Sequence, residues 1–161
     1  MKQIVYLLLT ILVMACGSGG DPAPTPTPTP PTPTVSVATL VKKVWTASTA
    51  QWDGVTKYDK TSSSNVVQGY SQYKLDLSTA GSVTLTEFDG KTFTGTYTVA
   101  TDGLSLTLNG LTSADGAPTG TSGTITYTIL VTPTATTLSL QQTTAYVKAS
   151  SAIVKLALVN P

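Results

Sequence analysis

The sequence contains no histidine, no arginine and only one cysteine, Cys16. Histidine is the usual general base and the commonest metal ligand, so its absence removes the usual routes to acid–base and metal chemistry. A single cysteine leaves the chain without an internal disulfide bond. All nine basic residues are lysines and the formal net charge is +1. This composition supplies no basic patch for phosphates and excludes nucleic acid as an expected partner.

Charged residues are also scarce, at 11% of the chain against ~25% in an average soluble domain. Threonine, by contrast, occurs 32 times. Threonine and valine favour strands, because branched side chains pack well on a pleated surface. The composition therefore predicts a β-rich, weakly charged protein outside the cytoplasm.

The first segment has the pattern of a lipoprotein signal peptide, residues 1–15. Lys2 precedes the apolar run "IVYLLLTILVM", whose eleven residues are too few to span a bilayer comfortably. "VMAC", residues 13–16, is similar to the lipobox of bacterial lipoproteins. That similarity implies cleavage before Cys16 and acylation of this residue, so that the expected partner is a membrane. Gly17, in place of an aspartate, favours the outer membrane and leaves open the periplasmic or surface face; a soluble secreted protein is the alternative.

Residues 16–34 combine the lipidated cysteine with a linker rich in proline and threonine, "PAPTPTPTPPTPT". Each proline fixes φ and biases the residue before it toward an extended backbone. The linker is therefore expected to be a polyproline II spacer of ~3.1 Å per residue. A proline-rich recognition ligand is the alternative reading.

Residues 35–161 show apolar side chains at every second position, which is typical of strands with one buried and one solvated face. Strand centres about ten residues apart, as in "YKLDL", "VTLTE" and "FTGTYTV", favour an up-and-down meander. We predict an all-β, eight-stranded antiparallel barrel. An immunoglobulin-like β-sandwich is the alternative, with crossings supplied by 109–122 and 143–152. The expected strands cover 44–50, 73–77, 83–87, 93–99, 104–108, 125–131, 138–140 and 154–158. In all but the first of them, the residue that begins the range and every second residue after it are expected to face inward.

Parity also predicts one hairpin register. A three-residue loop, Phe88-Asp89-Gly90, pairs Phe93 with Leu85 and keeps both inside, with Gly90 as the left-handed residue. This register sets Glu87 opposite Lys91, which predicts an ion pair at the rim.

Several of these stretches, among them "TLVKKVWTASTAQWDG", "FTGTYTVATDGLSLTLNG" and "ITYTILVTPTATTLSLQQTT", resemble the lipocalin-like (calycin-type) domains of lipoproteins common in Bacteroidetes. The shared features are a tryptophan in the first strand, a G-x-Y-x-V-x-x-D-G-x-x-L-x-L hairpin and a late L-x-L strand. Lys43 stands two residues before the tryptophan, where lipocalins carry a glycine. The resemblance implies an eight-stranded barrel on a lipid anchor. It implies no reaction and no cofactor.

The carboxylates do not predict a catalytic or metal site. Four of the eight precede a glycine and are explained by turn chemistry; these are Asp53, Asp89, Asp102 and Asp115. Only Glu87 shares a face with core residues, and glycoside hydrolysis needs a second inward carboxylate. Asp53 and Asp59 are too few for a calcium loop. We expect no enzyme activity, no cofactor and no metal.

A binding function remains. A closed barrel of eight strands is either filled by side chains or holds one small ligand. The first hypothesis is a barrel that binds a small apolar or amphipathic ligand, or an envelope partner; the second is a structural or adhesive module with a solid core. Oligomeric state stays open. The candidate ligand-binding residues of the interior are Trp45, Tyr73, Glu87, Phe93, Tyr97 and Tyr127.

Overall fold

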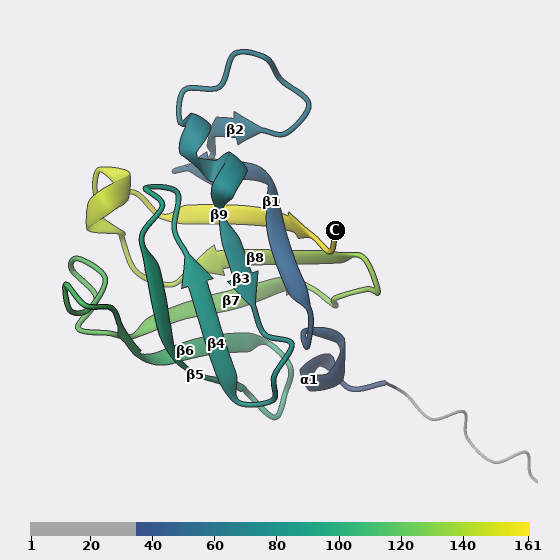
Figure 1. The fold of residues 1–161 in the computed structure, drawn as a ribbon. Coiled ribbons are helices and arrows are strands. Elements are labelled where there is room, and N and C mark those ends of the chain that lie inside the picture. The colour runs from purple at the N-terminus through teal and green to yellow at the C-terminus, as the bar shows by residue number, and fades with distance from the viewer. Residues whose placement is uncertain (1–34) are drawn as a thin grey trace, which may run out of the picture. The chain divides into compact units, whose positions relative to one another are not determined.

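A computed structural model describes residues 35–161, and the predicted signal peptide, Cys16 and linker lie outside the described residues. The described chain is built almost entirely of antiparallel strands (Figure 1). Its elements are α1 (Val37–Leu40), β1 (Val44–Trp52), β2 (Val55–Asp59), the 3-10 helix η1 (Gln68–Gln72), β3 (Lys74–Asp76), β4 (Ser82–Thr86), β5 (Thr92–Val99), β6 (Ser105–Thr112), β7 (Ile125–Val131), β8 (Thr137–Gln142), the 3-10 helix η2 (Val147–Ala149) and β9 (Val154–Val159).

Eight of the nine strands form a closed ring. From β3 to β9 each strand pairs with the next one in sequence. The long strand β1 closes the ring, because its first residues pair with β3 and the stretch from Thr46 to Trp52 pairs with β9. The predicted eight-stranded up-and-down barrel is confirmed, and a single continuous sheet excludes the two-layered sandwich.

The alternation in sequence explains which residues face inward. In β4, Val83 and Leu85 are buried while Thr84 is partly exposed. In β8 the same alternation buries Leu138, Leu140 and Gln142. The threonines lie mostly on the outer face, where their branched side chains suit a strand and their hydroxyls meet water.

The β4–β5 hairpin has the predicted register, with Leu85 opposite Phe93 and Gly90 at φ 81°. The predicted ion pair between Glu87 and Lys91 is wrong. Their main chains are joined by a hydrogen bond from the Glu87 N–H to the Lys91 carbonyl at 2.8 Å, but the Lys91 ammonium pairs with Asp115 at 3.2 Å. The Glu87 side chain points into the barrel instead.

Four elements were not predicted: strand β2 and the helices α1, η1 and η2. Strand β2 pairs only with the far half of β1, on the edge that β3 leaves free, while the opposite edge of β1 pairs with β9. Each helix is short, at three to five residues, so none produces a 3.6-residue pattern. They lie at the ends of the barrel, which we name the α1 end and the β2 end (Figure 1).

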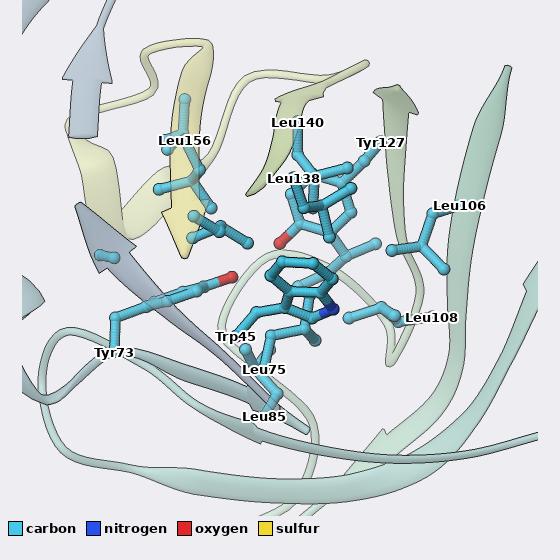
Figure 2. Packing of buried hydrophobic residues seen from close by; sticks show 14 of the residues in the cluster. Trp45, Tyr73, Leu75, Leu85, Leu106, Leu108, Tyr127, Leu138, Leu140 and Leu156 are labelled. Carbon is cyan, nitrogen blue, oxygen red and sulfur yellow. The ribbon is translucent and has the colours of Figure 1, made fainter. Parts of the chain in front are cut away.

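The α1 end is closed by side chains. The Trp45 indole Nε1 donates a hydrogen bond to the Val41 carbonyl at 2.8 Å, and both residues are fully buried. Helix α1 rests on the β5–β6 turn, where a Cβ added at Gly103 would lie 2.9 Å from Val37. Figure 2 shows Trp45 among leucines from other strands. The barrel interior toward the α1 end is therefore a packed apolar core.

Two predicted inward residues lie at the surface instead. Leu104 precedes β6 and is exposed, because the ring ends there. Val131 follows a register irregularity between β7 and β8, which shifts the alternation and leaves both Leu130 and Val131 exposed.

Candidate binding site at the β2 end

Glu87 is the last inward residue of the alternating β4 run and lies at the β2 end. Its side chain is 3% exposed. A buried carboxylate is costly unless it is paired and hydrogen-bonded. The partners of Glu87 therefore define the first part of the site.

Both partners come from the β8–β9 connection, residues 143–153, which we name the cover segment. The Tyr146 hydroxyl donates to Glu87 Oε1 and the Lys148 ammonium donates to Glu87 Oε2. The segment is folded back by a bridge between Tyr146 and Ala152. Its sharp bend uses two consecutive left-handed residues, Ser150 at φ 56° and Ser151 at φ 59°. Non-glycine residues adopt this conformation only when their surroundings impose it.

Lys148 joins two carboxylates. It also donates to Asp89 Oδ2 at 2.8 Å, and its side chain is 14% exposed. Burial alone would lower the pKa of Lys148, but the hydrogen bonds to Asp89 and Glu87 outweigh it and raise that pKa. Burial would raise the pKa of Asp89, but Lys148 holds it below the usual value of 3.8. Lys148 is thus held in its charged form.

Three tyrosines also belong to the site, and the pKa of each hydroxyl is raised. Burial, followed by the hydrogen bond to the Glu87 carboxylate, raises the pKa of Tyr146 well above its usual 10. Burial likewise raises the pKa of Tyr127 to about 12. Burial also raises the pKa of Tyr70, which accepts a hydrogen bond from Trp52 Nε1 at 2.9 Å. All these hydroxyls remain protonated at neutral pH.

Helix η1 brings Tyr70 over the barrel. The Tyr70 ring lies 4.9 Å from the ring of Phe88 and 6.0 Å from that of Tyr73, measured between centroids. The approach of η1 to the β4–β5 loop requires a glycine, because a Cβ at Gly69 would lie 1.9 Å from the Phe88 carbonyl oxygen. Aromatic rings therefore cover the part of the β2 end that the cover segment leaves free.

A small void remains beneath these groups, with a volume of about 10 Å³. It is lined by Tyr70, Tyr73, Glu87, Tyr127, Gln142 and Tyr146, among others. Two of its polar atoms, the Tyr73 hydroxyl and Gln142 Oε1, are buried without a well-aligned hydrogen bond, although the Tyr127 hydroxyl lies close enough to both residues for them to lower its pKa. Figure 2 shows the Tyr73 and Tyr127 hydroxyls pointing into the same part of the interior. The void is about the size that one water molecule requires.

A larger cleft of about 260 Å³ lies beside the void, and we name it the mouth cleft. Its walls are residues 120–126 and 142–146, which present mainly threonine hydroxyls. Gln142 and Tyr146 line both the mouth cleft and the void. These two side chains therefore separate the buried polar groups from solvent.

All six candidate residues lie inside the barrel, each at most 7% exposed. Tyr73, Glu87 and Tyr127 meet at the void. The other three do not. The Trp45 indole is hydrogen-bonded to the Val41 carbonyl at the α1 end. The Tyr97 hydroxyl donates to the Leu77 carbonyl at 3.2 Å. Phe93 packs in the barrel wall, and the Lys148 ammonium lies 5.3 Å from the centre of its ring.

Four residues of the site were missed: Tyr70, Gln142, Tyr146 and Lys148. Gln142 carried a signal, because extending the alternation of Leu138 and Leu140 by one step puts it inside. The others carried none. Lys148 contacts a residue 61 positions away, and only the folded chain reveals that contact.

Within residues 35–161 no group of three or more histidine, cysteine, aspartate or glutamate side chains is placed to hold a metal ion. The same residues include no helix of the length and apolarity needed to cross a membrane. The polar groups of the site can accept and donate hydrogen bonds, and they offer one buried ion pair.

Neither a protein-family model nor a curated protein matches the chain. Among solved structures, the chain is similar to a lipocalin-like protein from Bacteroides uniformis ATCC 8492, with 14% identity and a TM-score of 0.49 over 76% of this chain and 99% of that one. It is also similar to an uncharacterized protein from Bacteroides eggerthii DSM 20697, with 14% identity and a TM-score of 0.45 over 74% of this chain and 98% of that one. These likenesses are too distant to carry an argument about function. The eight-stranded antiparallel barrel follows from the strand order of this chain itself.

Proposed function

We propose that this chain is a lipid-anchored lipoprotein of the bacterial cell envelope that binds a small amphipathic molecule at the β2 end without changing it chemically. The anchor is an acylated Cys16, and the membrane is the outer membrane. The lipobox-like "VMAC" and the proline-rich stretch after it support this part of the proposal. The absence of histidine and arginine from the chain supports a non-catalytic role.

The observation that carries the binding proposal is a pair of buried polar atoms, Tyr73 Oη and Gln142 Oε1, that form no well-aligned hydrogen bond although the Tyr127 hydroxyl lies beside both. A buried polar atom without a partner costs about 1–3 kcal/mol. Such a cost is expected where a bound molecule supplies the missing hydrogen bonds. Both atoms adjoin the void, and Gln142 also faces the mouth cleft.

The size and lining of the site restrict the ligand. The mouth cleft, at about 260 Å³, is just below the range of roughly 300–1,000 Å³ found for most ligand pockets. Threonine residues line its walls, and Tyr70 and Phe88 line the adjacent void. A small molecule with both hydroxyl or amide groups and an apolar face fits this lining. A wholly apolar ligand fits poorly, because leucines already fill the barrel toward the α1 end.

Native mass spectrometry of the full chain, purified from its envelope in mild detergent, tests the binding proposal. We expect a bound small molecule in the unaltered protein and its loss in Gln142→Leu. Gln141→Leu is the matched control, because this neighbouring glutamine alternates to the outer face and is only partly buried. Retention of the molecule by Gln142→Leu would contradict the site.

A structural or adhesive module with a solid core is the second candidate. The observation in its favour is the interior itself, whose void holds no more than one water molecule. The same experiment separates the two candidates. Purified protein that carries no small molecule under any extraction condition would favour the structural module.

The anchor has its own test. We expect Cys16→Ser to leave the barrel folded and to release the protein from the membrane pellet. Fractionation followed by circular dichroism checks both halves of this expectation. A folded Cys16→Ser protein that still sediments with membranes would refute acylation as the means of attachment.

A further inference from the structure

Exposed apolar side chains gather at the α1 end. Four of the seven large hydrophobic residues exposed within 35–161 lie there. They are Val35 just before α1, Leu104 in the β5–β6 connection, and Leu130 and Val131 at the end of β7. We name this set the α1-end patch. Leu104 and Val131 are 62% and 67% exposed, which is unusual for residues that the alternation assigns to the core.

The members of the patch are linked by neighbouring structure. The Ile129 N–H donates to the Leu104 carbonyl at 2.8 Å, so Leu104 lies beside the end of β7. A groove of about 470 Å³ is lined by Val35, Val99 and Thr132, among others. A second groove of about 320 Å³ includes Val131 and the same Thr132. The two grooves therefore adjoin at Thr132, and both combine apolar side chains with serine and threonine.

The β2 end carries more charged side chains than the α1 end but no net charge, because its carboxylates are balanced by Lys57, Lys60, Lys91, Lys148 and Lys155. Within 35–161, five of the seven carboxylates lie at the β2 end: Asp53, Asp59, Glu87, Asp89 and Asp115. The α1 end carries only Asp76 and Asp102, together with Lys42 and Lys43. The Asp102 carboxylate is already engaged by the Leu104 N–H at 2.9 Å. An anionic lipid surface would therefore meet little repulsion at the α1 end.

Val35, the first described residue, lies at this end of the barrel next to α1. It directly follows the residues that lead back to Cys16. Eighteen residues, 17–34, separate the proposed lipidated cysteine from Val35. We infer that the α1-end patch rests on the surface of the lipid bilayer, so that the β2 end and its mouth cleft face away from the membrane. This inference depends on the proposed anchor.

The anchor makes such a contact feasible. A few exposed apolar side chains bind a bilayer only weakly when the protein is free in solution. Tethering converts the contact into an intramolecular one, so that the length and stiffness of the proline-rich spacer set the effective concentration of the patch at the bilayer. The patch then needs only a weak preference for lipid to be occupied most of the time.

Thiol accessibility on vesicles tests the inference. The full chain, lipidated on Cys16 and reconstituted into phosphatidylethanolamine–phosphatidylglycerol vesicles, would carry one added cysteine as its only free thiol. Val131→Cys and Leu104→Cys probe the patch. Val66→Cys and Val55→Cys are matched controls at the β2 end, because their native residues are 76% and 57% exposed. The same four variants in a Cys16→Ser background, without vesicles, give the reference rates for a membrane-impermeant maleimide.

We expect a loss of labelling at positions 131 and 104 on vesicles and unchanged labelling at 66 and 55, relative to the Cys16→Ser references. Equal rates at both ends of a protein that floats with the vesicles would overturn the docking surface and leave the anchor standing. Protection of positions 66 and 55 instead of 131 and 104 would also overturn the docking surface. Protein that fails to float would refute the anchor and the inference together. Protection of position 131 in the vesicle-free reference, rising with protein concentration, would identify a second copy of the chain as the occupant and overturn the membrane contact.

Discussion

The Tyr146 hydroxyl donates a hydrogen bond to the carboxylate of Glu87, 59 residues earlier in the chain. Both side chains are buried, and Lys148 donates to the other oxygen of the same carboxylate. The cover segment is thereby fixed to the β4–β5 hairpin by one buried acid. The stability of the β2 end should depend strongly on the partners of Glu87.

Lys148→Met removes the positive partner and leaves a buried carboxylate. Breaking a buried ion pair on one side typically costs about 3–5 kcal/mol of unfolding free energy. Urea unfolding followed by tryptophan fluorescence measures this cost. Lys91→Met is the matched control, because the exposed pair of Lys91 and Asp115 should contribute only about 0–1 kcal/mol. The double variant Lys148→Met with Glu87→Gln should recover part of the loss, and equal costs for the two lysine variants would contradict the buried pair.

Trp45→Ala should be among the most destabilising single substitutions in the barrel. It removes a fully buried indole at the α1 end and leaves the Val41 carbonyl without its donor. Truncation of a buried aromatic residue costs about 3–5 kcal/mol. Trp45→Phe keeps most of the packing and loses the hydrogen bond, so a smaller cost of about 1–3 kcal/mol is expected. Chemical unfolding that ranks Trp45→Phe as the worse of the two would be inconsistent with this packing.

Stability should change little between pH 5 and 9 and fall steeply above pH 10. The chain has no histidine to titrate near neutrality. Burial raises the pKa of Tyr127 from 10 to about 12 and also raises the pKa of Tyr70 and Tyr146. A pKa raised in the folded state contributes stability that is complete below the unfolded value and lost as pH rises toward the folded value.

Each such tyrosine adds a slope of about 1.4 kcal/mol per pH unit above pH 10. The raised pKa of Lys148 acts in the same direction above its usual 10.5. At the acid end, the lowered pKa of Asp89 removes stability as pH falls below 3.8. Thermal unfolding across pH 3–12 measures these slopes, and Tyr127→Phe should make the alkaline slope shallower. If Tyr127→Phe had the same alkaline slope as the unaltered protein, the raised pKa of Tyr127 would be contradicted.

Gly69→Ala tests the contact between η1 and the β4–β5 loop. The added Cβ would lie 1.9 Å from the Phe88 carbonyl oxygen, so the backbone must move. We expect a cost at or above the upper end of the ~1–3 kcal/mol typical of overpacking. Gly81→Ala is the control, because its surroundings are open and only its φ of 75° is unfavourable; about 1–2 kcal/mol is expected there. Thermal unfolding compares the two, and a milder effect at Gly69 would argue against close packing of η1.

The alternation of apolar residues was enough to predict the ring of eight strands and the pairing of Leu85 with Phe93, because these features follow from side-chain parity along single hairpins. The alternation does not reveal strand β2, because β2 is not a member of the ring of eight strands and only Tyr58 of its five residues is buried. The alternation wrongly predicts that Leu104 and Val131 face inward, because it does not reveal where a barrel wall ends or where the strand register shifts.

The candidate site was predicted only in part. Tyr73, Glu87 and Tyr127 followed from parity, and the structure brings these three together. The ion pair of Glu87 was assigned to Lys91, its neighbour across the hairpin. The actual partner, Lys148, comes from a connection whose path depends on packing at the barrel end. Contacts of this kind leave no local trace in a sequence.

The seam between β1 and β9 joins Thr46 to Val159, 113 positions later in the chain. Such distant pairing is slow to form during folding. Until it forms, β1 and β9 each present an unpaired edge that can recruit strands from other molecules. A chain that lacks residues 154–159 should therefore be lost to aggregation during biogenesis, even though every residue of the mouth cleft is still encoded.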